Sequence, residues 1–426
     1  MLAGATLGGG TTVNWCTSLR LPPQIAHEWA QSSGVENLER DLAPHYAWFE
    51  RRLGIGPAAH HNANNRVILD GACRLGEPAG ASPRNAAADC GDGCGYCGYG
   101  CAYGKKRSSA AALLPDLAGT GGAIYVNAVA LRVDISGGRA RGVVARQRTA
   151  TGETRTFEVD ANLVAVCAGA LRTPGLLARS GVRHPLLGKR LFLHPVASAV
   201  AQFDRPIEAW RGPMQSADSD AFNYLDGNYG AKIEVAPAHP GLAALAFPWR
   251  SRSAHAEQMT RLRNAATLIA LTRDRDFGSV DLDDEAYVRY RVSRYDGEHL
   301  LRALCGLVDI AFAGGAVRVS TLHARPIEIN RAQWTNAYRD EFAQRLRRIG
   351  VAPNRQILFS AHQMGTAAMG ADPARGVVGP NGRVWGVEGL IVADAAVFPQ
   401  SSGVNPMLTI MAMAGRIAAA NGALSA

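Results

Sequence analysis

Long apolar runs are missing from this sequence of 426 residues. A membrane-spanning helix needs about 20 predominantly apolar residues, and the most apolar stretch, near the C-terminus, is interrupted by Arg416. The N-terminus has neither the basic start nor the compact apolar core of a secretory signal. We therefore expect a cytoplasmic protein without a transmembrane span, and peripheral contact with a membrane stays open.

Dense basic runs with interleaved aromatic residues, which mark many nucleic-acid-binding surfaces, are also missing. The net charge is +9, from 45 basic and 36 acidic residues. The arginines are scattered, as in VARQRTATGETR and RLRRIG, and scattered charge is typical of a solvated surface. We therefore expect a globular protein with no nucleic-acid partner.

Cysteine is scarce: the chain has eight, too few for the disulfide framework of a small secreted domain. Four of them, Cys90, Cys94, Cys97 and Cys101, form a C-x3-C-x2-C-x3-C pattern in a glycine-rich loop over residues 90–107. Thiolates at this spacing can hold zinc or an iron–sulfur cluster. A structural loop without a metal is the alternative that we favour, so no metal is expected.

The strand, glycine-rich turn and acidic residue that open a dinucleotide-binding unit are not found at the start of the sequence. Met1 is followed almost at once by Gly8, Gly9 and Gly10, and then by Thr11. Consecutive glycines permit positive φ angles and let a planar ring approach the backbone. A ligand-binding loop and a flexible turn are both compatible with this segment.

Among the features that are present, residues 389–419 are the most informative. They predict a short buried strand over Leu390–Ala393 that ends at Asp394, and a helix that begins at Asn405-Pro406, because Asn is a favoured N-cap and Pro is favoured at the first helical position. Ligands of open α/β sheets lie at the carboxyl ends of strands, and a helix N-terminus suits an anion or an electron-rich ring. Ordinary packing of a strand-loop-helix unit is the alternative.

His362 precedes this stretch in the segment SAHQMGT, so that His362 and Asn405 bracket the same predicted strand. Both side chains could face one substrate hydroxyl, His362 as the base and Asn405 as a hydrogen-bonding partner. His194, which precedes Pro195, is a further histidine that could face an active site, although a structural role is more common for a lone histidine.

The remaining patterns predict an α/β class (α+β overall) with helices and strands interspersed. We expect a helix over residues 110–118, a β-hairpin that turns at 136–138, a buried strand over 162–167 and a helix that begins at Thr173-Pro174. Strand-like runs (AKIEVAP, YVRYRVS) and a helical run (HLLRALCGLVDIAFAGG) follow. The alternating charges of residues 271–284 predict a solvated hairpin, and the apolar residues 241–249 are compatible with a substrate tunnel or with core.

Several stretches carry a resemblance to a known family. HQMGTAAMG and GLIVADAAVFPQSSGVNPMLTIMAMAGRIA resemble the C-terminal signature of the glucose-methanol-choline (GMC) oxidoreductases, FAD enzymes that oxidise alcohols. LGGGTTVNWCTSLRLP resembles the family's glycine-rich flavin loop, and CAGALRTPGLLARSGV resembles its second signature. GCGYCGYGCAYGKKRSS resembles the corresponding stretch in the branch of the family that contains the long-chain fatty alcohol oxidases.

The resemblance implies a domain organisation. Residues 1–190 and 350–426 would form the two segments of an FAD-binding, Rossmann-like domain, and residues 191–349 a sheet-based substrate domain. In the family the ADP-binding unit lies upstream of the glycine-rich loop, so we expect this chain to begin inside the FAD domain.

The resemblance also implies cofactor contacts for named residues. Gly8, Gly9, Gly10, Thr11 and Asn14 would line the flavin ring. Ala130 would contact the adenine, and Asp394, Ala395, Pro406 and Met407 would contact other parts of the FAD.

The implied reaction is oxidation of an apolar, long-chain primary alcohol to an aldehyde, with His362 and Asn405 at the substrate oxygen. Oxygen or a quinone would accept the electrons. Two alternatives stay open: a dehydrogenase that passes electrons to a quinone or to a metal cluster, and a truncated, non-catalytic remnant.

Overall fold

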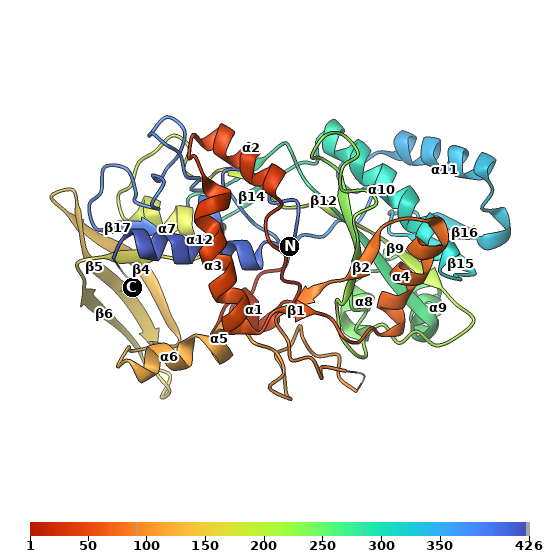
Figure 1. Ribbon diagram of the computed structural model, residues 1–426, viewed down its shortest axis with the longest axis horizontal. Helices are drawn as coiled ribbons and strands as arrows, with labels where there is room; N and C mark the ends of the chain where they lie inside the picture. Colours follow the sequence, from red (N-terminus) through yellow and green to blue (C-terminus); the bar gives the residue numbers. More distant parts are fainter. Residues whose placement is uncertain (92, 284, 423–426) are drawn as a thin grey trace.

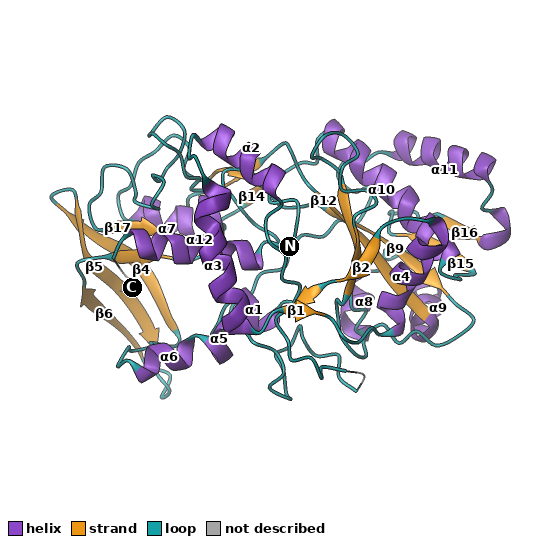
Figure 2. Cartoon of the chain, viewed as in Figure 1, coloured by secondary structure: helices purple, strands orange, loops and turns teal. Residues whose placement is uncertain are grey.

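The computed structural model describes residues 1–91, 93–283 and 285–422, arranged in two lobes (Figure 1). Strands gather in both lobes, while helices and loops fill the middle of the view (Figure 2). Each lobe has its own cluster of buried apolar side chains. The expected α/β class, α+β overall, is confirmed.

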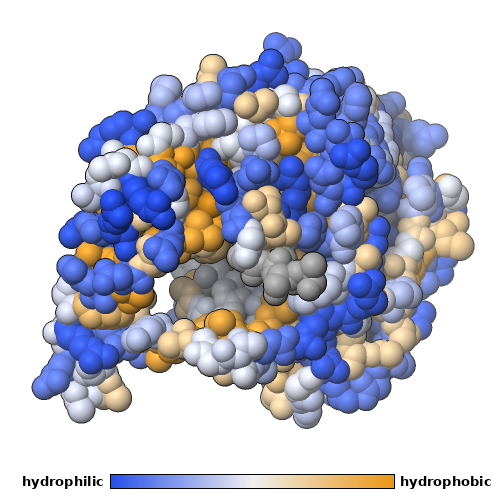
Figure 3. All heavy atoms as spheres, turned by 60° about the vertical axis from the view of Figure 1, so that its left-hand side comes forward, coloured by the Kyte–Doolittle hydropathy of each residue, from blue (hydrophilic) through white to orange (hydrophobic). Residues whose placement is uncertain are grey.

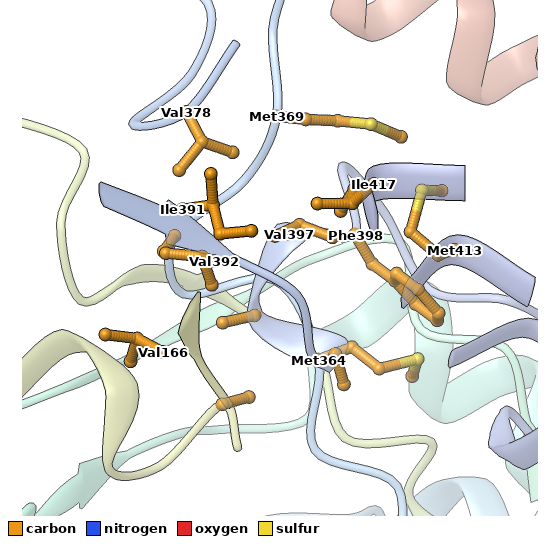
Figure 4. Packing of buried hydrophobic residues seen from close by; sticks show 14 of the residues in the cluster. Val166, Met364, Met369, Val378, Ile391, Val392, Val397, Phe398, Met413 and Ile417 are labelled. Carbon is orange, nitrogen blue, oxygen red and sulfur yellow. The ribbon is translucent and has the colours of Figure 1, made fainter. Parts of the chain in front are cut away.

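The core of the first lobe surrounds strand β17 (Leu390–Val392), which is entirely buried. β17 pairs in parallel with β7 (Val164–Val166). Helix α12 (Met407–Ala420) packs across helix α3 (Leu38–Leu53), where a side chain at Gly415 would press on His45. Side chains of β7, β17 and α12 meet in this core (Figure 4). The other elements of this lobe are α2 (Pro23–Ser33), α7 (Thr173–Arg179) and the antiparallel sheet of β4 (Ala128–Ser136), β5 (Arg139–Arg148) and β6 (Thr154–Asp160).

The core of the second lobe lies between an antiparallel sheet and two helices. The sheet has seven strands in the order β16-β15-β9-β12-β11-β10-β2, and helices α10 and α4 pack against it. Alanines dominate the paired strands β9 and β12, so the helices can lie close to the sheet. The bounds are α4 (Ala63–Leu75), β2 (Ala79–Ala81), β9 (Val196–Gln202), β10 (Ala217–Ser219), β11 (Ala231–Val235), β12 (Ala265–Thr272), α10 (Arg294–Ala313), β15 (Arg318–Thr321), β16 (Glu328–Asn330) and α11 (Asn336–Ile349).

Shorter elements complete the chain. They are α1 (Gly10–Val13), β1 (Gly56–Pro57), β3 (Pro83–Arg84), α5 (Ser109–Ala112), α6 (Leu114–Gly119), β8 (Lys189–Leu191), α8 (Pro240–Ala246), α9 (Arg252–Thr260), β13 (Gly278–Val280) and β14 (Val288–Arg289). Within the described residues, no helix combines the length and the apolar character that crossing a bilayer requires.

Most of the expected elements are present. β17, β7, α7, α10 and α12 occur where the sequence predicts them, and the β4–β5 hairpin turns through Gly137 and Gly138, both at positive φ. The helix expected over residues 110–118 is divided into α5 and α6 at Leu113. The domain division stays a prediction; helix α4, although within residues 1–190, packs on the sheet of the second lobe.

The prediction of a solvated hairpin over residues 271–284 is wrong for its first half. Arg273 and Asp274 are buried, because they directly follow β12 in the interior. Only the later part forms a hairpin, in which β13 pairs with β14 and with β8.

The apolar run 241–249 is mostly neither core nor tunnel. Helix α8 buries Ala243, and Phe247 beyond it is also buried, but Leu245 and Trp249 are 84% and 70% exposed. This run therefore presents apolar side chains on the surface.

The close approach of α4 and α10 generates a stability prediction. A Cβ atom added at Gly71 of α4 would overlap the carbonyl oxygen of Ile310 in α10. We expect Gly71→Ala to lower the free energy of unfolding by about 1–3 kcal/mol, since overpacking forces backbone shifts. Gly80→Ala is the control, because a Cβ there meets no atom within 4 Å. Equal thermal midpoints for the two variants in a melting experiment would contradict the prediction.

Candidate active site

His194 and His362 lie opposite each other because their segments pair as antiparallel backbone. Phe192 and Met364 exchange two backbone hydrogen bonds of 3.0 Å, and this register places residue 194 against residue 362. The Nδ1 atoms of the two histidines are 3.2 Å apart. His194 is fully buried, and His362 is largely buried.

The hydrogen bonds of His194 assign the tautomers of both rings. Gly403 donates its backbone N–H to His194 Nε2 at 3.0 Å, so Nε2 must be unprotonated. A neutral His194 then carries its proton on Nδ1 and donates it to His362 Nδ1. The remaining proton of a neutral His362 lies on Nε2.

Burial keeps both rings neutral near pH 7. Burial lowers the pKa of His362 to about 4. The pKa of His194 is held well below its usual value by burial, by His362 and by Arg273. Desolvation disfavours the charged imidazolium in each case.

Asp274 fixes the backbone that carries His194. Its carboxylate accepts hydrogen bonds from the backbone N–H groups of Leu193 (2.7 Å) and His194 (3.2 Å) and from the hydroxyl of Tyr290 (2.9 Å). These bonds hold His194 at φ +47°, a region that non-glycine residues rarely adopt. The carbonyl oxygen of Asp274 also accepts a hydrogen bond from the Ser401 hydroxyl.

Asn405 contacts a second buried carboxylate, that of Glu234 on β11. Asn405 Nδ2 lies 3.4 Å from Glu234 Oε2, which also accepts a hydrogen bond of 2.9 Å from Gln215. Burial raises the pKa of Glu234 to about 7. Within the described residues, Asn405 Oδ1 and Glu234 Oε1 are buried and have no hydrogen-bond partner. Buried polar atoms of this kind are normally satisfied, so a bound polar molecule would fit here.

The glycine-rich segment meets the start of helix α12. Asn14 Nδ2 lies 2.8 Å from Met407 Sδ, and Thr11 links the segment to α5 by accepting a hydrogen bond of 2.9 Å from the Ser109 N–H. A Cβ at Gly9 or Gly10 would meet no atom within 4 Å. These two glycines therefore border open space, in contrast to Gly8, where a Cβ would press on Ala110.

Helix α12 begins one residue later than expected, with Pro406 as its N-cap. Ile410 donates to the Pro406 carbonyl at 2.8 Å, which is the first hydrogen bond of the helix. The N–H groups of the first turn are therefore available to a ligand, as at any helix start.

Asp394 joins the ends of the two parallel strands. Its Oδ2 accepts hydrogen bonds from Gly169 N–H (2.8 Å) and the Thr173 hydroxyl (2.6 Å), and its Oδ1 accepts one from Ala396 N–H (2.7 Å). Burial raises the pKa of this carboxyl. Among the described residues Oδ1 accepts one hydrogen bond, so it keeps capacity for a second.

The other predicted cofactor residues are dispersed. The carbonyl of Ala395 accepts a hydrogen bond of 2.9 Å from Gly365 N–H, three residues beyond His362. Ala130 lies in the β4–β5 pairing, opposite Ala145, whereas the histidines lie in loop segments that pair through the isolated Phe192–Met364 bridge. Figure 3, in which the first lobe is turned toward the viewer, shows a hollow in the surface with apolar side chains around it.

Cys90, Cys94, Cys97 and Cys101 line one cavity but do not form a ligand cluster. In the part of the chain that the structure describes, no three cysteine, histidine or carboxylate side chains are arranged to hold a metal ion. Cys97 instead packs against Cys16 and accepts a hydrogen bond of 3.6 Å from Arg84 Nη2.

Sequence reasoning missed two residues and undervalued a third. Glu234 and Asp274 gave no functional signal, since one lies in a strand-like run and the other in a charged run. His194 was noticed but given a structural interpretation. The only available signal was the alternation Lys232-Ile-Glu234, which places two charges on the same side of a strand.

Family comparisons agree with the motifs. The chain matches the N-terminal GMC oxidoreductase model over residues 1–196 and the C-terminal GMC oxidoreductase model over residues 274–414. A long-chain-alcohol oxidase of Arabidopsis thaliana is 32% identical over 97% of this chain and 58% of that protein. An uncharacterized GMC-type oxidoreductase of Mycobacterium tuberculosis is 35% identical over 96% of this chain and 63% of that protein. The chain thus spans about three fifths of these relatives.

Solved structures share the fold. A pyridoxine 4-oxidase from Mesorbium loti superimposes with a TM-score of 0.69 over 100% of this chain and 85% of that chain, at 17% identity. A variant of formate oxidase from Aspergillus oryzae gives a TM-score of 0.69 over 99% and 85%, at 15% identity.

The hydrogen bonds of Asp274 generate a prediction. Asp274→Ala would leave three buried donors without an acceptor, so we expect a loss of unfolding free energy on the order of 3 kcal/mol or more. Asp281→Ala, later in the same charged run, removes a surface ion pair of 2.8 Å with Arg289. Its cost should be much smaller, because solvent-exposed ion pairs contribute little to stability. Denaturant titration measures both, and similar losses would refute the role of Asp274.

Proposed function

Because this chain belongs to the GMC oxidoreductase family, we propose that it binds FAD and oxidises a long-chain primary alcohol to an aldehyde. One observation carries the proposal: within the described residues, Asn405 and Glu234 each have a buried oxygen without a hydrogen-bond partner. The loop that carries Asn405 also contacts His194, the partner of His362, through Gly403 N–H. Family membership supports the oxidation of an alcohol. The long chain of the substrate is proposed by analogy with the relatives that are long-chain-alcohol oxidases.

The residues present fit a flavin. Gly9 and Gly10 border open space, the first turn of α12 offers N–H groups, and Asn14 reaches Met407 at that turn. When bound, FAD supplies the hydride acceptor. The chain's own residues then hold the ring, with the helix start favouring negative charge, and keep the substrate in place. The contacts proposed for Ala130 and Asp394 belong to the same proposal.

His362 and Asn405 are proposed to hold the substrate oxygen, and His362 to take the hydroxyl proton. The tautomer of the histidine pair imposes one condition. His362 Nε2 can accept a proton only when the ring's own proton lies on Nδ1, which requires the contact with His194 Nδ1 to open. Glu234 is the competing proton acceptor, because its pKa of about 7 lies closer to neutral pH than the pKa of His362 does, and a general base works best near the operating pH.

The electron acceptor separates two versions of this function. Oxygen as acceptor would give steady peroxide formation under air, whereas a dehydrogenase would require a quinone. A metal cluster as acceptor has no support from the described cysteines. A non-catalytic remnant would show no change of FAD absorbance on mixing with the chain.

Peripheral contact with a membrane is part of the same proposal. Leu245 and Trp249 are exposed, and so are Tyr96 and Tyr99, whose rings approach His239 at the start of α8. Exposed apolar and aromatic side chains of this type favour an interface with lipid. Such an interface would bring an apolar alcohol close to the protein.

The first functional prediction concerns His362. The chain is mixed with FAD, and bleaching of the flavin absorbance by a long-chain primary alcohol is followed without oxygen. We expect His362→Ala to slow bleaching by about 10²-fold or more while FAD stays bound. His27→Ala, an exposed histidine that contacts Gln31, is the control. Fast bleaching in His362→Ala would end the assignment.

The pH dependence separates His362 from Glu234. A base works in its unprotonated form, so the bleaching rate rises with pH through the pKa of the base. With His362 at about 4, we expect a rate that is constant from about pH 6 to 8 and that Glu234→Gln changes less than about tenfold. If the bleaching rate instead rises near pH 7, and this rise is absent in Glu234→Gln, Glu234 is the base that takes the hydroxyl proton.

A further inference from the structure

A cavity of about 310 Å³ is lined by neither His362 nor Asn405. Five thiols and two lysines contribute to its walls: Cys16, Cys90, Cys94, Cys97, Cys101, Lys105 and Lys106. The proposed oxidation of an alcohol uses none of them. Five thiols around one cavity need a separate explanation, and among the described residues no three of them are arranged to hold a metal ion.

Two of these thiols form a pair. Cys16 and Cys97 are both buried, and they pack together in a small apolar cluster with Met214. Cys16 follows the glycine-rich segment and has φ +76°, whereas Cys97 belongs to the cysteine-rich turn. The two thiols therefore bring together segments that are far apart in the sequence.

Buried cations surround the pair. Arg84 Nη2 lies 3.6 Å from Cys97 Sγ, and Arg84 Nη1 lies 3.9 Å from Cys90 Sγ. Lys106 Nζ donates to the carbonyl of Cys97 at 3.0 Å. The hydrogen bond from Cys16, with Arg84 and Lys106, lowers the pKa of Cys97 to about 5, and the same hydrogen bond and burial raise the pKa of Cys16. A stabilised thiolate beside a protonated thiol is typical of a reactive cysteine and its resolving partner.

We propose that Cys16 and Cys97 form a redox-active dithiol, which a hydroperoxide that enters the cavity oxidises to a disulfide. The Cys97 thiolate attacks one peroxide oxygen, the O–O bond breaks, and the leaving oxygen takes a proton. Cys97 becomes a sulfenic acid. The Cys16 sulfur then attacks the Cys97 sulfur, the S–O bond breaks, and water leaves with the Cys16 proton. Two thiols are oxidised, and one peroxide is reduced to two hydroxyl products.

Oxidation at this pair would act on the glycine-rich segment. Lys106 Nζ also donates to the carbonyls of Thr12 (2.8 Å) and Asn14 (2.7 Å), so hydrogen bonds already connect the glycine-rich segment to the cysteine-rich turn. A disulfide between Cys16 and Cys97 would add a covalent link between the same two segments. The disulfide itself does not depend on the proposed alcohol oxidation.

The test is peptide mapping of the full chain without reduction, after treatment with stoichiometric hydrogen peroxide. We expect a peptide that joins Cys16 to Cys97, reversed by dithiothreitol, and a decrease of two from the eight titratable thiols. A disulfide between other cysteines, or oxidation of the exposed Cys73 before Cys97, would overturn the proposal.

Variants assign the roles. In Cys16→Ser the sulfenic acid on Cys97 should persist and react with dimedone. In Cys97→Ser no sulfenic acid should form at this pair, and Cys16 should remain a thiol. Arg84→Gln should slow disulfide formation by about tenfold or more, since the thiolate loses its cation. Arg20→Gln, an exposed arginine paired with Glu50, is the control. Should a variant fail to fold, the mapping of the unmodified chain still decides.

Discussion

The carboxylate of Asp274 is the constraint on which the candidate site depends. A buried carboxylate is costly unless hydrogen bonds compensate it, and here the compensating donors are Leu193 N–H, His194 N–H and the Tyr290 hydroxyl. The same residue accepts a hydrogen bond from Ser401 through its carbonyl. One residue at the end of β12 therefore fixes both the loop that carries His194 and the loop that leads to α12.

Asp394 repeats this arrangement in the other lobe. Its carboxylate accepts hydrogen bonds from the segment after β7 and from the turn after β17. These bonds hold the ends of the two parallel strands at a fixed distance from each other. In both cases a carboxylate stands at the end of a strand and satisfies loop N–H groups that would otherwise be buried without a partner. The site is thus held by buried carboxylates at the ends of two different sheets.

Local patterns allowed the elements to be predicted, whereas the pairings between distant segments could not be. The apolar run of β17, the proline at the start of α12 and the Gly137-Gly138 turn are each encoded within a few residues. His194 and His362 meet only through the Phe192–Met364 bridge, and no local signal records that register. Glu234 and Asp274 show the same limit from the opposite direction. Their charged side chains suggest exposure to solvent, but the sheet around them buries both residues. Burial in turn determines their pKa values and their hydrogen bonds.

The loop before α12 couples the groups that are proposed to touch the substrate. Gly403 N–H sets the tautomer of His194, and His194 sets the nitrogen of His362 that carries a proton. Asn405, two residues further on, faces Glu234. A shift of this loop would therefore change the proton position on His362 and the placement of Asn405 together. The Ser401 hydroxyl anchors the loop by donating to the Asp274 carbonyl. The chemistry of His362 and Asn405 therefore depends on this hydrogen bond as well as on the identity of the two side chains.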